Sequence, residues 1–90
     1  MMADDVMVRL AETIAARRAA PGDRSYTRQL LDGGPEKCAR KFGEEAIETV
    51  VAGLGADPKA LATEAADVIF HLLVLLEARG LTWLDVAAVH

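Results

Sequence analysis

The segment Pro35–Arg79, PEKCARKFGEEAIETVVAGLGADPKALATEAADVIFHLLVLLEAR, decides the fold. It contains two stretches of helix-forming residues that are separated by a short boundary rich in glycine and aspartate. Pro35 and Pro58 each suit the first position of a helix, where the missing N–H costs nothing. We therefore expect helices over 35–54 and 58–79, joined by a loop short enough to make them antiparallel neighbours.

The rest of the chain also favours helices. Apolar residues recur at helical spacing over 3–20, which predicts an amphipathic helix. The stretch 24–31 has no sustained period, so we expect a loop with a single short helical turn there. After Gly80, the pattern Thr82-x-x-Asp85 resembles a capping box and predicts a short last helix. The expected fold class is all-α, a small helical bundle of about four helices.

Length and composition agree with this fold class. The 90 residues are 52% hydrophobic and 27% charged, with one Trp, one Tyr and two Phe, which suits helices rich in Ala, Leu and Val. A chain this short forms one domain, residues 1–90, and buries only about 60–65% of the surface that its unfolded form exposes. We therefore expect an oligomer to complete the core.

Charge and hydropathy exclude several classes of function. The net charge of −4 and the absence of a basic cluster argue against nucleic-acid binding. The apolar run Val68–Leu76 is far shorter than the ~20 residues that span a bilayer, and the acidic N-terminus, with Asp4 and Asp5, does not resemble a signal peptide. Cys38 is the only cysteine, so we expect a reducing, cytoplasmic setting.

Five acidic residues form the most informative pattern in the chain. Glu45 and Glu48 lie one turn apart on one expected helix, and Glu64 and Asp67 lie one turn apart on the next. Across two antiparallel helices, these pairs would present four carboxylates to each other. Glu44 lies at the edge of the same sector.

A solvated helix face is the alternative interpretation of the first acidic pair. Lys37 and Lys41 lie in the same sector, and pairs such as Lys41 and Glu45 at i,i+4 stabilise a helix by about 0.2–0.5 kcal/mol. On the pattern of this helix alone, ordinary surface ion pairs explain the charges as well as a binding site does.

The second acidic pair favours a site. Almost every residue from Ala60 to Leu76 is apolar, so we expect this helix to be buried on most of its circumference. Glu64, Asp67 and His71 share one stripe of it, and a buried carboxylate needs a partner cation. A metal ion or a lysine of the preceding helix can be that partner. His71 is either a core-edge residue or a ligand contact.

The chemistry of the acids indicates the metal. Carboxylate ligation favours Mg²⁺, with Mn²⁺ as the alternative, over Zn²⁺, copper or iron. Mg²⁺ usually binds substrate phosphates as well, so the pattern suggests hydrolysis of a phosphoanhydride. Lys37, Lys41 and Arg40 are then candidate phosphate partners.

The sequence resembles the phosphoribosyl-ATP pyrophosphohydrolase family, which belongs to the all-α, MazG-like NTP pyrophosphohydrolases. The resemblance extends from Ser25 to about Val89. The acidic pairs alone indicate only the wider superfamily. The Ser-Tyr-Thr segment and the Gly-Pro-Glu-Lys helix start narrow the resemblance to the family of the histidine pathway. The landmarks are Ser25-Tyr26-Thr27, Gly34-Pro35-Glu36-Lys37 with Lys41, Glu44-Glu45-Ala46-Ile47-Glu48, Glu64-Ala65-Ala66-Asp67, His71-Leu72-Leu73-Val74-Leu75-Leu76 and Arg79-Gly80-Leu81.

The resemblance implies an activity and an assembly. The reaction is the Mg²⁺-dependent cleavage of phosphoribosyl-ATP to phosphoribosyl-AMP and pyrophosphate, the second step of histidine biosynthesis, by water attack at the α–β linkage. The assembly is a homodimer with active sites near the subunit interface, and a higher oligomer is left open. So is association with a separate phosphoribosyl-AMP cyclohydrolase.

The resemblance also implies roles for individual residues. Four carboxylates are expected to hold the metal: Glu45, Glu48, Glu64 and Asp67. Catalytic carboxylates are expected at Glu44, Glu45 and Glu48, with Glu44 a further ligand or the base that orients the water. Substrate contacts are expected from Lys37, Lys41, Ser25, Tyr26, Thr27 and His71.

Two other functions remain open from the sequence. A MazG-like house-cleaning enzyme would hydrolyse ordinary or damaged nucleoside triphosphates through the same acids. A non-catalytic helical dimerisation module would carry the acids as solvated surface charges.

Overall fold

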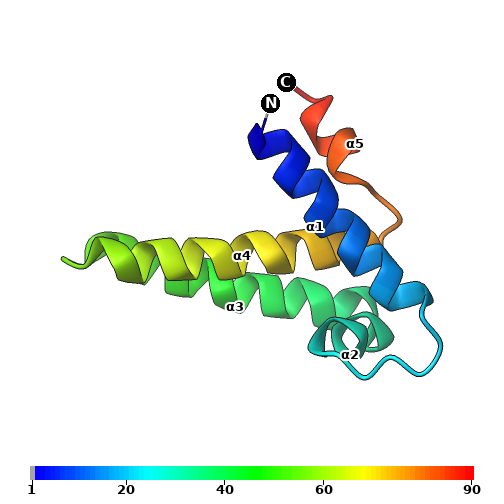
Figure 1. The fold of residues 1–90 in the computed structure, drawn as a ribbon. Coiled ribbons are helices and arrows are strands. Elements are labelled where there is room, and N and C mark those ends of the chain that lie inside the picture. Colours follow the sequence, from blue (N-terminus) through cyan, green and yellow to red (C-terminus); the bar gives the residue numbers. More distant parts are fainter. Residues whose placement is uncertain (1) are drawn as a thin grey trace.

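The chain is all-α, as predicted. The computed structural model describes the backbone of residues 2–90 and the side chains of residues 6–90. These residues form five helices rather than about four (Figure 1). The helices are α1 (Met2–Ala19), α2 (Tyr26–Asp32), α3 (Gly34–Leu54), α4 (Pro58–Ala78) and α5 (Trp83–Ala87).

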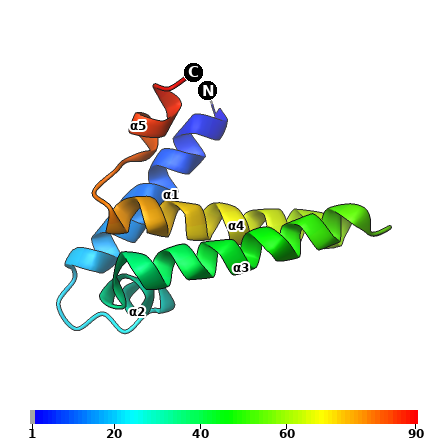
Figure 2. The same cartoon turned by 180° about the vertical axis from the view of Figure 1, so that it is seen from behind.

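A long antiparallel hairpin of α3 and α4 dominates the molecule (Figures 1 and 2). Gly34 has φ of 84°, a left-handed conformation that favours glycine, and Pro35 follows with its preset helical φ. At the other end, Asp57 caps α4 by accepting a hydrogen bond from the Lys59 amide. The turn chemistry therefore fixes both ends of the pair, as the sequence predicts.

A small core lies where α1 and α2 meet this hairpin. Its buried residues come from four helices: Ile14, Leu30, Cys38, Leu73 and Val74. The Cys38 thiol donates a hydrogen bond to the Leu30 carbonyl over 3.2 Å. Arg18 fastens α1 to the end of α4, because its guanidinium donates to the carbonyl and the carboxylate of Glu77 at 2.8 and 2.9 Å.

The expectation of a loop with one short helical turn over 24–31 underestimates the helix, because α2 occupies most of this stretch. Ser25 is its N-cap, with a hydroxyl that accepts a hydrogen bond from the Arg28 amide. Seven residues are too few to show a helical period in sequence. The cap is the local signal that could have revealed the helix.

The short last helix is confirmed. Gly80 has φ of 75° and ends α4, and Thr82 and Asp85 form both hydrogen bonds of a capping box at the start of α5. None of the helices within the described residues is long and apolar enough to cross a membrane.

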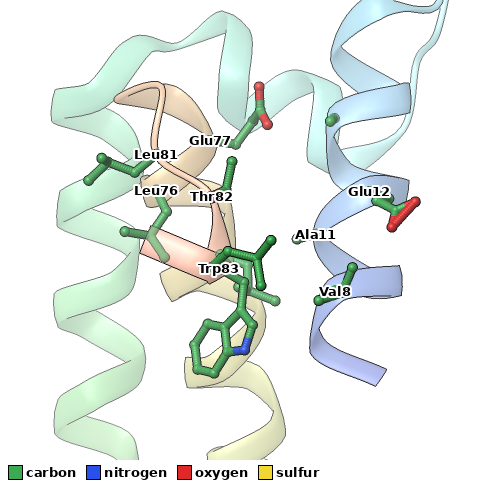
Figure 3. Close-up of a pocket in the computed structure, with 11 residues that line it drawn as sticks. Val8, Ala11, Glu12, Leu76, Glu77, Leu81, Thr82 and Trp83 are labelled. Atoms are coloured by element: carbon green, nitrogen blue, oxygen red, sulfur yellow. The ribbon is translucent and has the colours of Figure 1, made fainter. Parts of the chain in front are cut away.

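An apolar cavity of about 240 Å³ separates α5 from the helices beneath it. Figure 3 shows Trp83 of α5 with Val8 and Ala11 of α1 on its walls, and Leu76 of α4 also lines it. The Trp83 Nε1 atom is buried without a hydrogen-bond acceptor among the described residues. No acidic residue of the expected metal site lines this cavity, so it is a separate feature of the molecule.

The far half of the hairpin stands clear of the other helices (Figures 1 and 2). The radius of gyration is 13.7 Å, whereas a compact domain of this length has about 12 Å. The expectation that α4 is buried on most of its circumference is wrong for the single chain, because its buried residues are only His71, Leu73 and Val74. Apart from α3, none of the described helices covers the first half of α4 (Figures 1 and 2).

Candidate active site

Three carboxylates meet between α3 and α4. Glu45 and Glu48 lie one turn apart on α3, and Glu64 lies opposite them on α4 because the two helices run antiparallel. One oxygen of each carboxylate can be chosen so that all three lie within 4.8 Å of one another. We call these three residues the acidic cluster.

Thr49 holds the two helices together beside the acidic cluster. Its hydroxyl lies 2.8 Å from the carbonyl oxygen of Glu45 and 3.1 Å from that of Glu64. This contact fixes the separation of the two backbones where the acids face each other. The sequence analysis missed Thr49, because only the register between the helices shows which carbonyls its hydroxyl reaches.

The electrostatics of the acidic cluster are unfavourable without a cation. Burial raises the pKa of Glu45 above its ordinary value, and the neighbouring carboxylate of Glu48 adds to this effect. Burial also raises the pKa of Glu64, and the charge of Glu48 again contributes. Asp67 raises both pKa values further through its charge. The carboxylates therefore repel one another when they are ionised.

The acidic cluster fits a hard divalent cation. The Oε2 atoms of Glu45 and Glu64 are buried and have no hydrogen-bond partner among the described residues. A buried acceptor without a donor is costly, and a cation is the partner that also relieves the repulsion. The donors are all carboxylate oxygens, which suit Mg²⁺ or Mn²⁺. Glu48 is exposed, so the cluster is open to solvent on one side.

The other predicted acids lie around this cluster. Asp67 is exposed and is not one of the three converging residues, although its charge acts on Glu45 and Glu64. Glu44 is also exposed, and its carboxylate pairs with the Lys41 ammonium at 3.3 Å. The structure thus brings three of the five acids together and leaves Glu44 on the outer face of α3.

The predicted phosphate-binding residues Lys37 and Lys41 lie on α3, about two turns and one turn before Glu45. Lys41 is half-buried and engages Glu44. The aliphatic part of Lys37 lies over Gly33, where a Cβ atom would collide with it. Both lysines therefore lie on the part of α3 that adjoins α2.

The predicted substrate residues of the first landmark, Ser25-Tyr26-Thr27, lie at the start of α2. Ser25 uses its hydroxyl as the N-cap, and Thr27 is half-buried in the first turn. The Tyr26 hydroxyl lies 3.2 Å from Nε2 of His71, and Nδ1 of His71 lies 2.8 Å from the carbonyl oxygen of Asp67. His71 therefore connects α2 to the stripe of α4 that carries the acids.

Comparisons with known proteins agree with this arrangement. The family model for phosphoribosyl-ATP pyrophosphohydrolase matches residues 7–89. A phosphoribosyl-ATP pyrophosphatase of Cereibacter sphaeroides is 54% identical over 84 residues, which cover 93% of this chain and 82% of that protein.

Two further relatives carry the same name. Phosphoribosyl-ATP pyrophosphatase 1 of Bradyrhizobium diazoefficiens is 58% identical over 79 residues, which are 88% of this chain and 74% of that protein. The phosphoribosyl-ATP pyrophosphatase of Nitrobacter hamburgensis is 58% identical over 77 residues, or 86% of this chain and 72% of that protein. The chain therefore belongs to the phosphoribosyl-ATP pyrophosphohydrolase family.

Proposed function

We propose that this chain hydrolyses phosphoribosyl-ATP to phosphoribosyl-AMP and pyrophosphate, the second step of histidine biosynthesis. The observation that carries the proposal is the acidic cluster, in which two buried carboxylate oxygens have no donor among the described residues. Membership of the family and the names of the similar enzymes supply the substrate. A non-catalytic module has no need of such costly acids, so a helical dimerisation module is the weaker interpretation.

Glu45, Glu48 and Glu64 hold Mg²⁺ in this proposal, with Asp67 beside them and Mn²⁺ as the alternative ion. An ion held by these residues would offset the charge of the triphosphate and would make the attacking water more acidic. The water oxygen forms a bond to the α-phosphorus, and the bond from that phosphorus to the oxygen bridging it to the β-phosphorus breaks. Pyrophosphate leaves with the electron pair, and a carboxylate beside the site takes up the proton that the water loses.

The remaining roles follow the positions of the side chains. Lys37 and Lys41 bind phosphate oxygens from the start of α3. Lys41 gives up its ion pair with Glu44 when it binds the substrate phosphate. Glu44, once released, is the further ligand or the base that orients the water. Ser25 and Thr27 contact the substrate from α2. These roles rest on the resemblance and remain predictions.

We further propose that two copies of the chain form a homodimer. Ile47, Val50, Val51 and Leu54 recur at i, i+3, i+4 and i+7 along α3, and their exposed fractions range from 63% to 86%. We call these four residues the apolar stripe. Burial of such a side chain contributes about 1.5–3 kcal/mol, so a second copy on this stripe would supply the core that the short chain lacks.

The apolar stripe adjoins the acidic cluster. Glu48 follows Ile47 directly and precedes Val51 by one turn, so a partner that covers the stripe also approaches Glu48. In this proposal the active site lies near the interface between two copies. A cytoplasmic location, expected from the single cysteine, stays a prediction.

The test is pyrophosphate release from purified protein with phosphoribosyl-ATP, ATP or dNTPs, each with and without Mg²⁺. We expect Mg²⁺-dependent release from phosphoribosyl-ATP and poor release from the others. Glu48→Gln should lower the rate by about 100-fold or more while circular dichroism shows an unchanged helical content. Efficient cleavage of dNTPs with poor cleavage of phosphoribosyl-ATP would instead assign a house-cleaning enzyme.

A further inference from the structure

An aromatic group lies between α2 and α4, on the side of the acidic cluster that faces α2. Tyr26 of α2 and Phe70 and His71 of α4 pack together, with ring centroids 5.1 to 6.3 Å apart. Phe70 was not among the residues predicted from sequence. The chain has few aromatic residues, so their concentration beside a candidate nucleotide site needs a reason.

The hydrogen bonds of His71 fix the position of Tyr26. The carbonyl oxygen of Asp67 can only accept, so Nδ1 of His71 carries the proton in that bond, and Nε2 of the neutral ring is an acceptor. The Tyr26 hydroxyl therefore donates to Nε2. His71 is 6% exposed, so its ring is held by packing as well.

Tyr26 is packed on two sides but is still half exposed. Phe70 stacks against Tyr26 with an angle of 23° between the rings, and His71 meets it edge-on at 72°. Tyr26 is nevertheless 50% exposed. The ring is therefore packed against Phe70 and bonded to His71, while half of the residue's surface stays accessible to a flat ligand.

The distance from the acidic cluster suits a nucleotide. Glu64 and His71 share one stripe of α4, and seven residues of helix rise about 10 Å, which is comparable to the length of a nucleoside monophosphate. Nδ1 of His71 also bonds to the carbonyl of Asp67, which lies one turn from Glu64, so this end of the aromatic group adjoins the acids. A ligand with its phosphates at the acids can therefore extend its base to Tyr26.

We propose that the accessible surface of Tyr26 stacks on the purine base of the substrate, and that His71 is the positioning residue that holds Tyr26 for this contact. The inference rests on the proposed function, because it takes the acidic cluster as the site of the phosphates. The stacking contact of Tyr26 would let the site distinguish a nucleotide from a polyphosphate that has no base. Stacking on an aromatic side chain tolerates every base but requires one.

Calorimetric binding of two product-like probes tests the proposal without turnover. AMP and pyrophosphate are each titrated into the wild type, Tyr26→Leu and Tyr26→Phe in the presence of Mg²⁺. We expect Tyr26→Leu to weaken AMP binding by about 10- to 100-fold and to leave the Kd of pyrophosphate unchanged. Tyr26→Phe keeps the ring and loses only the tether, so its loss for AMP should be smaller.

His71→Gln tests the positioning role, because a glutamine can still accept the hydroxyl of Tyr26. We expect the His71→Gln single variant to retain most AMP binding. Adding His71→Gln to Tyr26→Phe should not change the Kd of AMP any further. Equal losses for AMP and pyrophosphate, unchanged AMP binding in Tyr26→Leu, or no AMP binding by the wild type would each overturn the inference. Pyrophosphate release from phosphoribosyl-ATP is measured separately, so failure of the proposed function is seen independently.

Discussion

The Glu64→Gln variant should be at least as stable as the wild type without Mg²⁺ and less stable than the wild type with Mg²⁺. Without the cation, Glu64→Gln removes one of three crowded carboxylates and replaces a buried, unpartnered oxygen by a neutral amide of the same shape. We expect the metal-free variant to melt at the same temperature as the wild type or higher, because less like charge remains in the cluster.

The size of the Mg²⁺ effect follows from mass action. A cation at 100 times its Kd stabilises the folded state by about 2.7 kcal/mol, which raises the Tm of a domain of this size by about 10–20 °C. If the variant binds Mg²⁺ about 100-fold more weakly, the same concentration adds only about 0.4 kcal/mol, or about 2–3 °C. The two melting curves should therefore cross over as Mg²⁺ is added.

Thermal melts followed by circular dichroism at one fixed protein concentration measure this crossover. Glu12→Gln is the matched control, because Glu12 is an exposed acid of α1 and its loss changes the net charge equally. Its Tm should follow the wild type with and without Mg²⁺. A wild type whose Tm does not respond to Mg²⁺, or a Glu64→Gln variant that gains as much as the wild type, would refute the reasoning.

Three other predictions concern pH, the core and the apolar stripe. Because the pKa values of Glu45 and Glu64 are raised, the metal-free protein binds more protons when it is folded than when it is unfolded. The free energy of unfolding from urea melts should therefore fall as the pH rises above 4.5. Saturating Mg²⁺ should abolish that fall. Leu30→Ala removes a side chain that is 0% exposed and should cost about 2–5 kcal/mol in a chemical melt. Leu54→Lys should yield a monomer of unchanged helicity in light scattering, whereas a persistent dimer would show that the stripe is not the interface.

The sequence predicts the hairpin well because its ends carry local signals. Pro35, Asp57 and Gly80 each act through their own backbone geometry, which does not depend on distant residues. The same signals failed for α2, where seven residues offer no period and only the Ser25 cap marks the start. Local chemistry therefore predicts long helices better than short ones.

The candidate site was predicted in part for a similar reason. The spacing of Glu45 and Glu48 on one helix is local, and the antiparallel pairing adds Glu64. The contacts of Thr49 and the stacking of Phe70 depend on the register between helices, which the pattern of either helix alone does not contain. The burial of α4 was overestimated because an apolar helix can be covered by a second chain as well as by its own.

The hydroxyl of Thr49 also has a consequence for the order of folding. Its contact with Glu64 spans 15 residues of chain, whereas the contact of Arg18 with Glu77 spans 59. Each doubling of a loop costs about 0.6 kcal/mol of closure entropy, so the contact of α1 costs about 1.2 kcal/mol more to form. The hairpin is therefore the favoured nucleus, and the mutually repelling acids come together before the core of the molecule has closed around Leu30.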